Sequence, residues 1–335
     1  MYPNPFIYKK PLDPGRDDLV MIGRTALLEK TMSGLAFGHW FVISGGKKIG
    51  KTTFLAMLME ECRIKGLPYH FISIKLEELP SFNLAGLYQA LCEGLRELLA
   101  SDAAEGFSSP PDLEEVKHML IAAAQQKGAA EKIVIILETF ESFPRAFAQE
   151  ALRGLISLQQ AQAMRKLPPN FQFIVSGVLN TIDLQVEQGH SFSEYSMRVL
   201  LEDFRYEDIE VMLARVSREL GLACEPGFGR LLYDHTSGVG YLVQKICYRT
   251  LESAFVRKEP MALTLKRAEA AIASIIKEGE TNIEMVITQI EKDPQLIESL
   301  MRVLRAGSVS AKKFDPQLKT LLALGALSVQ NGFFR

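Results

Sequence analysis

Five short apolar runs, separated by longer stretches of helical periodicity, dominate the first two hundred residues. The runs are rich in β-branched, aromatic and aliphatic residues, and most of them lack the alternation of a strand with one solvated face. They predict buried strands at residues 39–44, 69–76, 132–137, 171–176 and 197–201. Helix-length segments connect these runs, so we expect a mostly parallel sheet with helices on both faces.

Beyond about residue 203 the pattern changes to nearly continuous helical periodicity. A short helix at 316–324 and two strands about the turn dipeptide Asn331-Gly332 indicate a winged-helix-like segment. The chain ends where its second strand should continue, so we expect a piece of a longer protein. We predict an N-terminal arm at 1–20, an α/β domain at 21–203, a helical lid at 204–280 and a truncated winged-helix-like domain at 281–335.

The predicted helices of the α/β domain lie at 52–65, 84–99, 113–126 and 147–164, with a further helical pattern beginning near residue 25. Those of the second part lie at 207–220, 227–235, 241–258, 265–278 and 294–305.

Composition narrows the class of protein. Of the 335 residues, 47% are hydrophobic and 23% charged, which is a globular balance. Lys and Arg (38) nearly cancel Asp and Glu (40), which argues against a whole-chain polyanion binder but not against a local basic patch. No run of 18 apolar residues and no secretory signal occur, so we expect a cytoplasmic protein without a membrane span. The four Cys and five His residues show no metal-ligand spacing.

A phosphate-binding motif follows the first predicted strand. Gly45-Gly-Lys-Lys-Ile-Gly50-Lys51-Thr52 matches GxxxxGK[ST] in full, between a predicted strand and a predicted helix. Glycines let the loop turn its N–H groups toward phosphate oxygens, and the helix adds its N-terminal partial charge. Lys51 then reaches the β- and γ-phosphates, and the Thr52 hydroxyl ligates Mg²⁺. The predicted nucleotide-binding residues here are Gly45, Gly46, Lys47, Lys48, Ile49, Gly50, Lys51, Thr52 and Thr53.

The acidic strand of this fold class is unusual in this chain. Glu138 stands where Asp is expected, and we assign it to the magnesium shell together with Thr52. Thr139 stands where a water-activating Glu is expected, and a hydroxyl is a poor base at neutral pH. Glu141 either substitutes as the base or is a solvated loop acid. Ser176 either lies near the γ-phosphate or is a small turn residue, so both are open catalytic candidates.

Several motifs together resemble one group of ATPases. They are Asn4-Pro-Phe, Ile22-Gly-Arg24, the phosphate loop, and Thr236-Ser-Gly-Val-Gly240-Tyr-Leu-Val-Gln244. This set resembles the STAND and AAA-like P-loop ATPases, relatives of Orc/Cdc6 initiators and of NACHT and NB-ARC switches. Thr25 replaces the acid that usually follows Gly-Arg. Gly240 replaces a proline that packs near the nucleotide base, which weakens the assignment of a base contact to this position.

The resemblance implies a P-loop NTPase fold with ATP or ADP and Mg²⁺ held between the sheet domain and the lid. It implies that backbone around Ile22 and Gly23 borders adenine. The chain has no Asn-Lys-x-Asp guanine signature, which also favours adenine. Such proteins often assemble with triphosphate bound or signal to an effector, so we expect self-association or a partner protein. Arg145 and Arg198 are either arginine fingers or surface residues.

The sequence therefore predicts an ATP-binding regulatory or signalling NTPase whose hydrolysis is slow or absent. An alternative is an Orc/Cdc6-like, ATP-dependent DNA-binding protein. Its basic candidates are Lys312, Lys313 and Lys319, with Arg302 and Arg305 upstream, but the predicted recognition helix has few base-reading residues, so DNA is not favoured. A second alternative is a nucleotide-bound scaffold without turnover.

Overall fold

The computed structural model forms two compact units. The sheet unit comprises residues 25–44 and 58–200, and the helical unit comprises 1–24, 45–57 and 201–335. The phosphate loop therefore has most of its contacts in the helical unit, although it directly follows a strand of the sheet unit. The structure describes residues 4–99, 110–178, 185–187, 190–279, 281–310, 315–327, 329–330 and 333–334.

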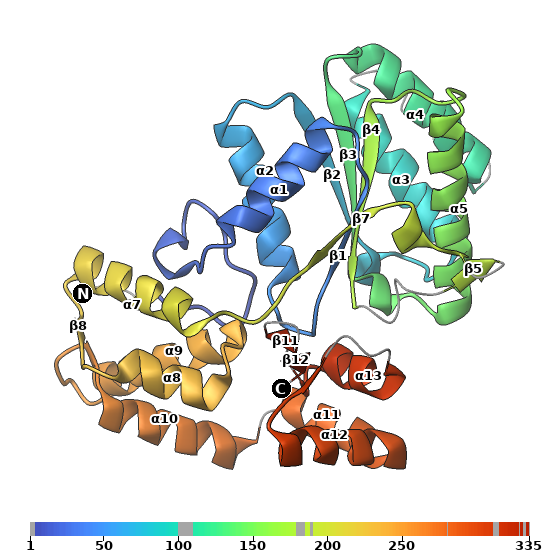
Figure 1. The fold of residues 1–335 in the computed structure, drawn as a ribbon. Helices are drawn as coiled ribbons and strands as arrows, with labels where there is room; N and C mark the ends of the chain where they lie inside the picture. The colour runs from blue at the N-terminus through green and yellow to red at the C-terminus, as the bar shows by residue number, and fades with distance from the viewer. Residues whose placement is uncertain are drawn as a thin grey trace. The chain divides into compact units, whose positions relative to one another are not determined.

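A five-stranded parallel sheet is the centre of the sheet unit (Figure 1). The strand order is β2-β3-β4-β1-β7, so the first strand in the chain lies between two strands that follow it much later. Ile43 of β1 is level with Ser176 of β4 and Val199 of β7. All five predicted strands are confirmed. Their bounds are Phe41–Ser44 (β1), Tyr69–Lys75 (β2), Lys132–Glu138 (β3), Phe171–Gly177 (β4) and Met197–Leu200 (β7).

Helices cover both faces of this sheet, as predicted. In Figure 1, α3, α4 and α5 lie against one face and α1 and α2 against the other. Strand β4 is buried along its whole length, as a strand covered on both faces must be. The helix bounds are Thr25–Ala36 (α1), Lys51–Ile64 (α2), Leu84–Leu98 (α3), Leu113–Lys127 (α4) and Arg145–Ala163 (α5).

Aromatic packing fills the face of the sheet under α3, α4 and α5. The Trp40 ring lies 4.9 Å from the Phe173 ring and 6.0 Å from the Phe171 ring, measured between centroids. Phe192, from a short 3-10 turn at Phe192–Glu194, is also fully buried in this cluster. Other 3-10 turns lie at Leu76–Glu78 and Phe140–Ser142, and β5 (Gln185–Glu187) pairs with β6 (His190–Ser191).

Polar side chains from the sheet hold the end of α1. Lys132 Nζ donates to the carbonyl oxygens of Leu35 (2.9 Å) and Ala36 (2.6 Å). The buried Gln172 Nε2 donates to the same Leu35 oxygen at 2.8 Å. These bonds satisfy carbonyls that have no partner within the helix and place a cation at its negative end.

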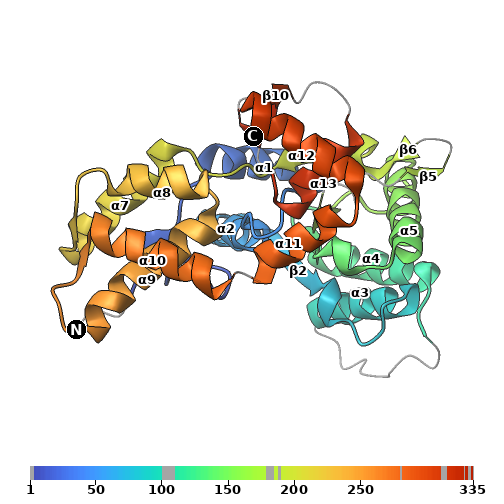
Figure 2. The ribbon, with the colours of Figure 1, turned by 90° about the horizontal axis from the view of Figure 1, so that it is seen from below.

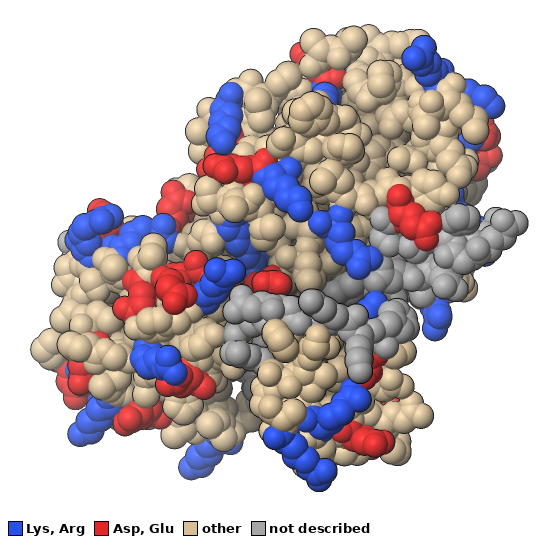
Figure 3. Space-filling view, in the orientation of Figure 1, with Lys and Arg blue, Asp and Glu red and all other residues tan. Residues whose placement is uncertain are grey.

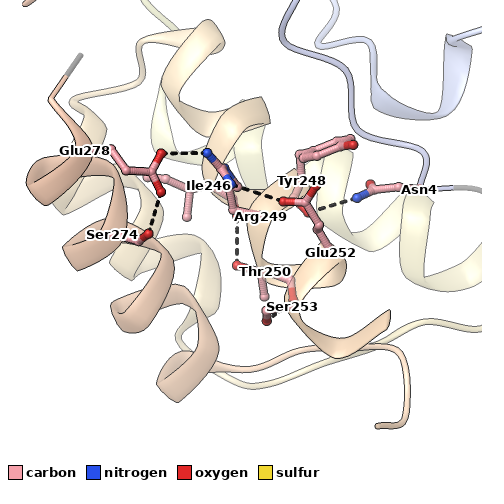
Figure 4. Close-up of polar contacts among 9 residues, drawn as sticks. All are labelled: Asn4, Ile246, Tyr248, Arg249, Thr250, Glu252, Ser253, Ser274 and Glu278. Carbon is pink, nitrogen blue, oxygen red and sulfur yellow. Dashed lines mark hydrogen bonds and ion pairs between the residues drawn. The ribbon is translucent and has the colours of Figure 1, made fainter. Parts of the chain in front are cut away.

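Within the helical unit, the helices α7 to α10 share one core with the start of the chain. Phe6, Val20 and Ile22 are buried among α7, α8, α9 and α10, and Gln244 donates to the Val20 oxygen at 2.7 Å. Figure 4 shows Asn4 donating to the Tyr248 oxygen and Arg249 bridging α9 to Glu278 of α10. The bounds are Tyr206–Leu220 (α7), Phe228–Thr236 (α8), Gly240–Val256 (α9) and Leu265–Glu278 (α10), with Asp18–Val20 a 3-10 turn and β8 (Ala223–Cys224) parallel to β9 (Ala262–Leu263).

The last segment runs in the order helix, helix, strand, helix, strand, strand (Figure 2). The sequence predicted only its second and third helices and the final two strands, and the winged-helix-like domain stays a prediction. Its strands form a three-stranded antiparallel sheet in the order β10-β12-β11, over a small core of its own. The sequence analysis missed α11. The elements are Thr281–Glu291 (α11), Pro294–Ala306 (α12), Val309–Ser310 (β10), Pro316–Leu324 (α13), Val329–Gln330 (β11) and Phe333–Phe334 (β12), and Lys312, Lys313 and the Asn331-Gly332 dipeptide lie outside the described residues.

The packing around Trp40 gives a stability prediction. Replacing Phe173 by Ala should lower the free energy of unfolding by about 3–5 kcal/mol, because a buried ring leaves a cavity against the indole. Trp40 is the single tryptophan, so its fluorescence during urea denaturation follows the sheet unit. Phe37→Ala is the matched control, since that ring is 79% exposed and its loss should change stability by less than about 0.5 kcal/mol. Equal effects of both variants would contradict this packing.

Candidate phosphate-binding site

The loop between β1 and α2 curls back on itself. Lys48 and Gly50 have positive φ angles of 61° and 95°, and the helix begins directly afterwards at Lys51. Lys51 Nζ donates to the carbonyl oxygens of Gly45 (3.3 Å) and Gly46 (3.1 Å). The lysine ammonium therefore lies over the loop. The N–H groups at the N-terminus of α2 also point toward the loop.

Close packing explains the first glycine of the loop. A methyl group added to Gly45 would lie 2.9 Å from Ile49 Cγ2 and 3.0 Å from the Leu201 oxygen. Both distances are too short, so a side chain here would force the loop open. At Gly50 the requirement is conformational instead, because its φ of 95° strains any other residue.

The two threonines after Lys51 occupy the first turn of α2 and are half-buried. Thr53 Oγ1 accepts a hydrogen bond from the Leu12 amide at 3.2 Å, so this hydroxyl holds the N-terminal arm. No local sequence pattern predicted that contact. Thr52 belongs to the helical unit, whereas Glu138, its predicted magnesium partner, belongs to the sheet unit.

Glu138 ends β3 as a buried carboxylate. Its side chain belongs to a residue only 5% exposed, and Oε1 accepts a hydrogen bond from Ser73 Oγ at 2.7 Å. Ser73 lies on β2, the neighbouring strand. A buried carboxylate with one hydroxyl donor suits a second-sphere or direct role toward a divalent cation.

Thr139 redirects the chain after β3. It has a left-handed conformation, with φ 58° and ψ 46°, which is uncommon for a β-branched residue. A 3-10 turn follows, and Glu141 Oε2 then accepts a hydrogen bond from the Val178 amide at 3.2 Å. Val178 comes directly after β4, so the structure brings Glu141 to the strand end that carries Ser176. These two catalytic candidates are therefore neighbours.

Hydroxyl groups mark the ends of the two central strands. Ser176 is only 2% exposed near the end of β4, and Ser44 is fully buried as the last residue of β1. Ser44 Oγ has no hydrogen-bond partner in the described part of the chain. A buried, unpartnered hydroxyl directly before the phosphate loop fits a site for a polar ligand.

Gly240 packs on an aromatic ring of its own chain. A methyl group added to it would lie 2.7 Å from Phe204 Cε2, and one added to Gly238 would lie against the Phe204 oxygen at 1.8 Å. Gly238 also has a φ of 83°, and its own oxygen accepts from the Phe204 amide at 3.0 Å. The Phe204 ring thus occupies the space that a proline at position 240 would need.

Arg24 connects this ring to the phosphate loop. Its Nη2 donates to the oxygens of Ile49 and Glu202, each at 2.9 Å, and its guanidinium carbon lies 4.6 Å from the Phe204 ring centroid. Burial lowers the pKa of Arg24 to about 10, although the nearby negative charge of Asp203 raises it. Burial also raises the pKa of Asp203 to about 6, with Arg24 opposing the shift. Arg24 and Asp203, which precede α1 and α7, thus influence each other's pKa.

A second cation–aromatic contact joins the loop to α9. Lys48 Nζ lies 3.6 Å from the centroid of the Tyr241 ring. Lys245 is only 7% exposed, and its Nζ lies 5.8 Å from the Tyr8 ring and 5.9 Å from the Tyr241 ring. Two lysines and two tyrosines from three segments therefore meet beside the loop, a grouping that no local sequence pattern predicts.

Two further charged candidates belong to the sheet unit. Arg145 and Arg198 are exposed residues of α5 and β7. On the face seen in Figure 3, basic and acidic side chains are intermixed among uncharged residues. In the described ranges no three His, Cys, Asp or Glu residues are grouped as metal ligands, and none of the helices is long and apolar enough to cross a membrane.

The four cysteines are free thiols. Burial raises the pKa of Cys62 and Cys224 to about 11 and that of Cys92 to about 12. These thiols stay protonated at neutral pH and are packing residues rather than nucleophiles.

Several solved structures share this architecture. A Walker-type ATPase of Pyrococcus abyssi has a TM-score of 0.68 and 13% identity, over 98% of this chain and 95% of that chain. The ORC2 protein of Aeropyrum pernix, solved as ADPNP and ADP complexes, has a TM-score of 0.57 and 17% identity, over 97% and 90%. Cdc6p of Pyrobaculum aerophilum has a TM-score of 0.56 and 13% identity, over 95% and 92%.

These similarities show the fold alone: the chain shares the architecture of the Walker-type ATPase, of the ORC2 protein and of Cdc6p, in line with the resemblance of the motifs to relatives of Orc/Cdc6. Identities this low carry no further inference about function. No protein-family model matches the sequence, and no curated protein matches it either.

The Asp203 carboxyl gives a prediction for pH. Its pKa is about 6 in the folded chain and about 3.9 in an unfolded one, so the folded state holds the proton more tightly. That contribution to stability is complete below pH 4 and is lost as the pH rises through 6. The melting temperature of wild type should therefore fall relative to that of Asp203→Asn between pH 4.5 and 7.5. A difference between the two proteins that stays constant across this range would contradict the assignment.

Proposed function

We propose that this chain is an ATP-binding regulatory NTPase that hydrolyses its nucleotide slowly or not at all. The observation that carries the proposal is the loop at 45–50, which curls under the Lys51 ammonium at the start of α2. A triphosphate would lie against the loop N–H groups, with Lys51 on its β- and γ-phosphates. Backbone around Ile22 and Gly23 would border the adenine.

The residues present also suit Mg²⁺. Thr52 would ligate the ion and Glu138 would support it, and when bound the ion neutralises charge on the phosphates. Ser73 would orient the Glu138 carboxylate through their hydrogen bond. These are roles for the chain's own groups, and they do not depend on turnover.

Slow turnover is expected from the residues after β3. Thr139 offers a hydroxyl where a carboxylate would activate water, and it has a left-handed backbone. Glu141 is the remaining acid, and the Val178 amide holds one of its oxygens. That hydrogen bond holds the Glu141 carboxylate at the end of β4. We therefore expect nucleotide to bind but to be hydrolysed slowly, which suits a nucleotide-dependent switch.

DNA binding is the second candidate, because the structure neighbours include an ORC1 protein solved in complex with DNA. Against it stand the near-neutral charge and the composition of α13, whose sequence Pro-Gln-Leu-Lys-Thr-Leu-Leu-Ala-Leu has few base-reading side chains. A nucleotide-bound scaffold is the third. In each case self-association or an effector protein would receive the nucleotide-dependent change.

Two measurements on the purified protein separate these candidates. Nucleotide extracted from purified protein and identified by mass reveals a permanently filled scaffold. Binding of duplex DNA that weakens with salt, and that is lost on changing Lys312 and Lys313 to Glu, would favour the initiator-like candidate. Failure of duplex DNA to bind at low salt would eliminate it.

Replacing Lys51 by Ala should weaken ATP binding at least about tenfold, since the phosphate charge loses its partner. Calorimetric titration with Mg-ATP measures the change. Lys65→Ala is the control, because Lys65 follows the other end of α2 and pairs with Glu61. An affinity for the Lys51 variant within twofold of wild type would show that Lys51 does not hold phosphate.

Turnover should be below about 1 per second, the lower end for working enzymes. Phosphate release, measured beside nucleotide affinity, tests this. If the residual activity uses Glu141, Glu141→Gln should abolish it while leaving Mg-ATP affinity within about threefold. Turnover well above 1 per second would contradict the role given to Thr139.

A further inference from the structure

We propose that Arg24 is a positioning residue of the phosphate loop, which fixes one peptide group of the loop and ties it to the Phe204 ring of the lid. The inference rests on the proposed nucleotide-binding function of that loop. It concerns the last residue of the Ile22-Gly-Arg24 motif, a side chain to which the sequence analysis gave no role. Three contacts of one guanidinium carry it.

The first contact sets the direction of a loop amide. Arg24 Nη2 donates to the Ile49 oxygen at 2.9 Å. That oxygen and the Gly50 N–H belong to the same planar trans peptide, so they point in opposite directions. Holding the oxygen outward on Arg24 therefore keeps the Gly50 N–H turned the other way. Without this contact the peptide is free to rotate, because a glycine follows it and tolerates either sign of φ.

The second and third contacts anchor the guanidinium itself. The same Nη2 donates to the Glu202 oxygen at 2.9 Å, and the group lies 4.6 Å from the Phe204 ring centroid. A planar guanidinium can donate in its plane and stack on a ring at once, whereas an ammonium cannot. The position is therefore specific for arginine, not for positive charge alone.

The lid fixes the ring on which Arg24 rests. Gly238 and Gly240 approach Phe204 so closely that neither could carry a side chain without moving it. The contacts thus run without a break from the start of α9 through Phe204 and Arg24 to Ile49. Movement of the lid would reach the loop through this guanidinium, which gives the predicted switch a physical connection.

Arg24→Lys is the test variant, because it keeps the charge and loses the planar donor group. Three probes are titrated: ADP, inorganic pyrophosphate, and adenosine, which has no phosphate. We expect about tenfold weaker binding of ADP and pyrophosphate and unchanged adenosine affinity, since the loss of a charge-assisted bond affects only the loop. A merely structural role would lower the affinity for all three alike.

Arg267→Lys is the matched control. Arg267 Nη1 also donates to two main-chain oxygens, those of Pro260 and Ala262, within the lid and without contact to the loop. It should keep wild-type affinity for every probe. Phe204→Leu removes the ring but keeps Arg24, and should give part of the loss. The double variant Arg24→Lys/Phe204→Leu should lose less than the sum of the two.

The outcomes separate the two proposals. Wild-type ADP binding, its loss in Lys51→Ala, and ADP affinity within twofold of wild type in Arg24→Lys would overturn the role of Arg24 alone. An equal loss for all three probes in Arg24→Lys would overturn it as well. Absence of ADP and pyrophosphate binding to wild type would overturn the proposed function and this inference together.

Discussion

An ammonium group lying over main-chain carbonyls shapes the segment between β1 and α2. Lys51 donates to the oxygens of Gly45 and Gly46, so the lysine that begins the helix also closes the loop that precedes it. In a trans peptide the C=O and the N–H point in opposite directions, so a peptide whose carbonyl faces the cation turns its N–H away from it. Arg24 acts in the same sense on Ile49 from outside the loop. The loop is thus shaped by two cations of its own chain, and the proposed nucleotide site depends on that shape.

The strand order brings the remaining candidates to one edge of the sheet. Because β1 pairs with both β4 and β7, its end faces strand ends that come from far along the chain. Parallel strands finish at the same edge, which is where open α/β sheets bind ligands. Glu138, Glu141 and Ser176 all belong to that edge of the sheet unit. The left-handed turn at Thr139 is what lets Glu141 reach the end of β4.

The strands could be predicted because burial on both sheet faces requires a continuous apolar run. Most helices could be predicted because burial of one face requires apolar residues at helical spacing. Helix α11 was missed although Ile283, Val286, Ile287 and Ile290 have helical spacing, since Gly279 and the polar residues after it resemble a loop. The motif GxxxxGK[ST] identified the loop without any structure. The contacts of Arg24 could not be predicted, because they join residues 24, 49, 202 and 204, which no local pattern relates. Likewise, the resemblance gave a reason to expect proline at position 240, and only the packing of Phe204 explains a glycine.

The placement of the first residues within the helical core has a consequence for biosynthesis. Val20 and Gln244, which are hydrogen bonded, are 224 residues apart, and Phe6 is fully buried among helices that follow residue 205. Ribosomes add about 5–20 residues per second, so the amino terminus emerges roughly 10–45 s before its binding partners exist. During that interval its apolar side chains lack their native packing partners. The core of the helical unit therefore cannot be completed until most of the polypeptide has been made, and until then the apolar residues of the amino-terminal arm lack their native packing.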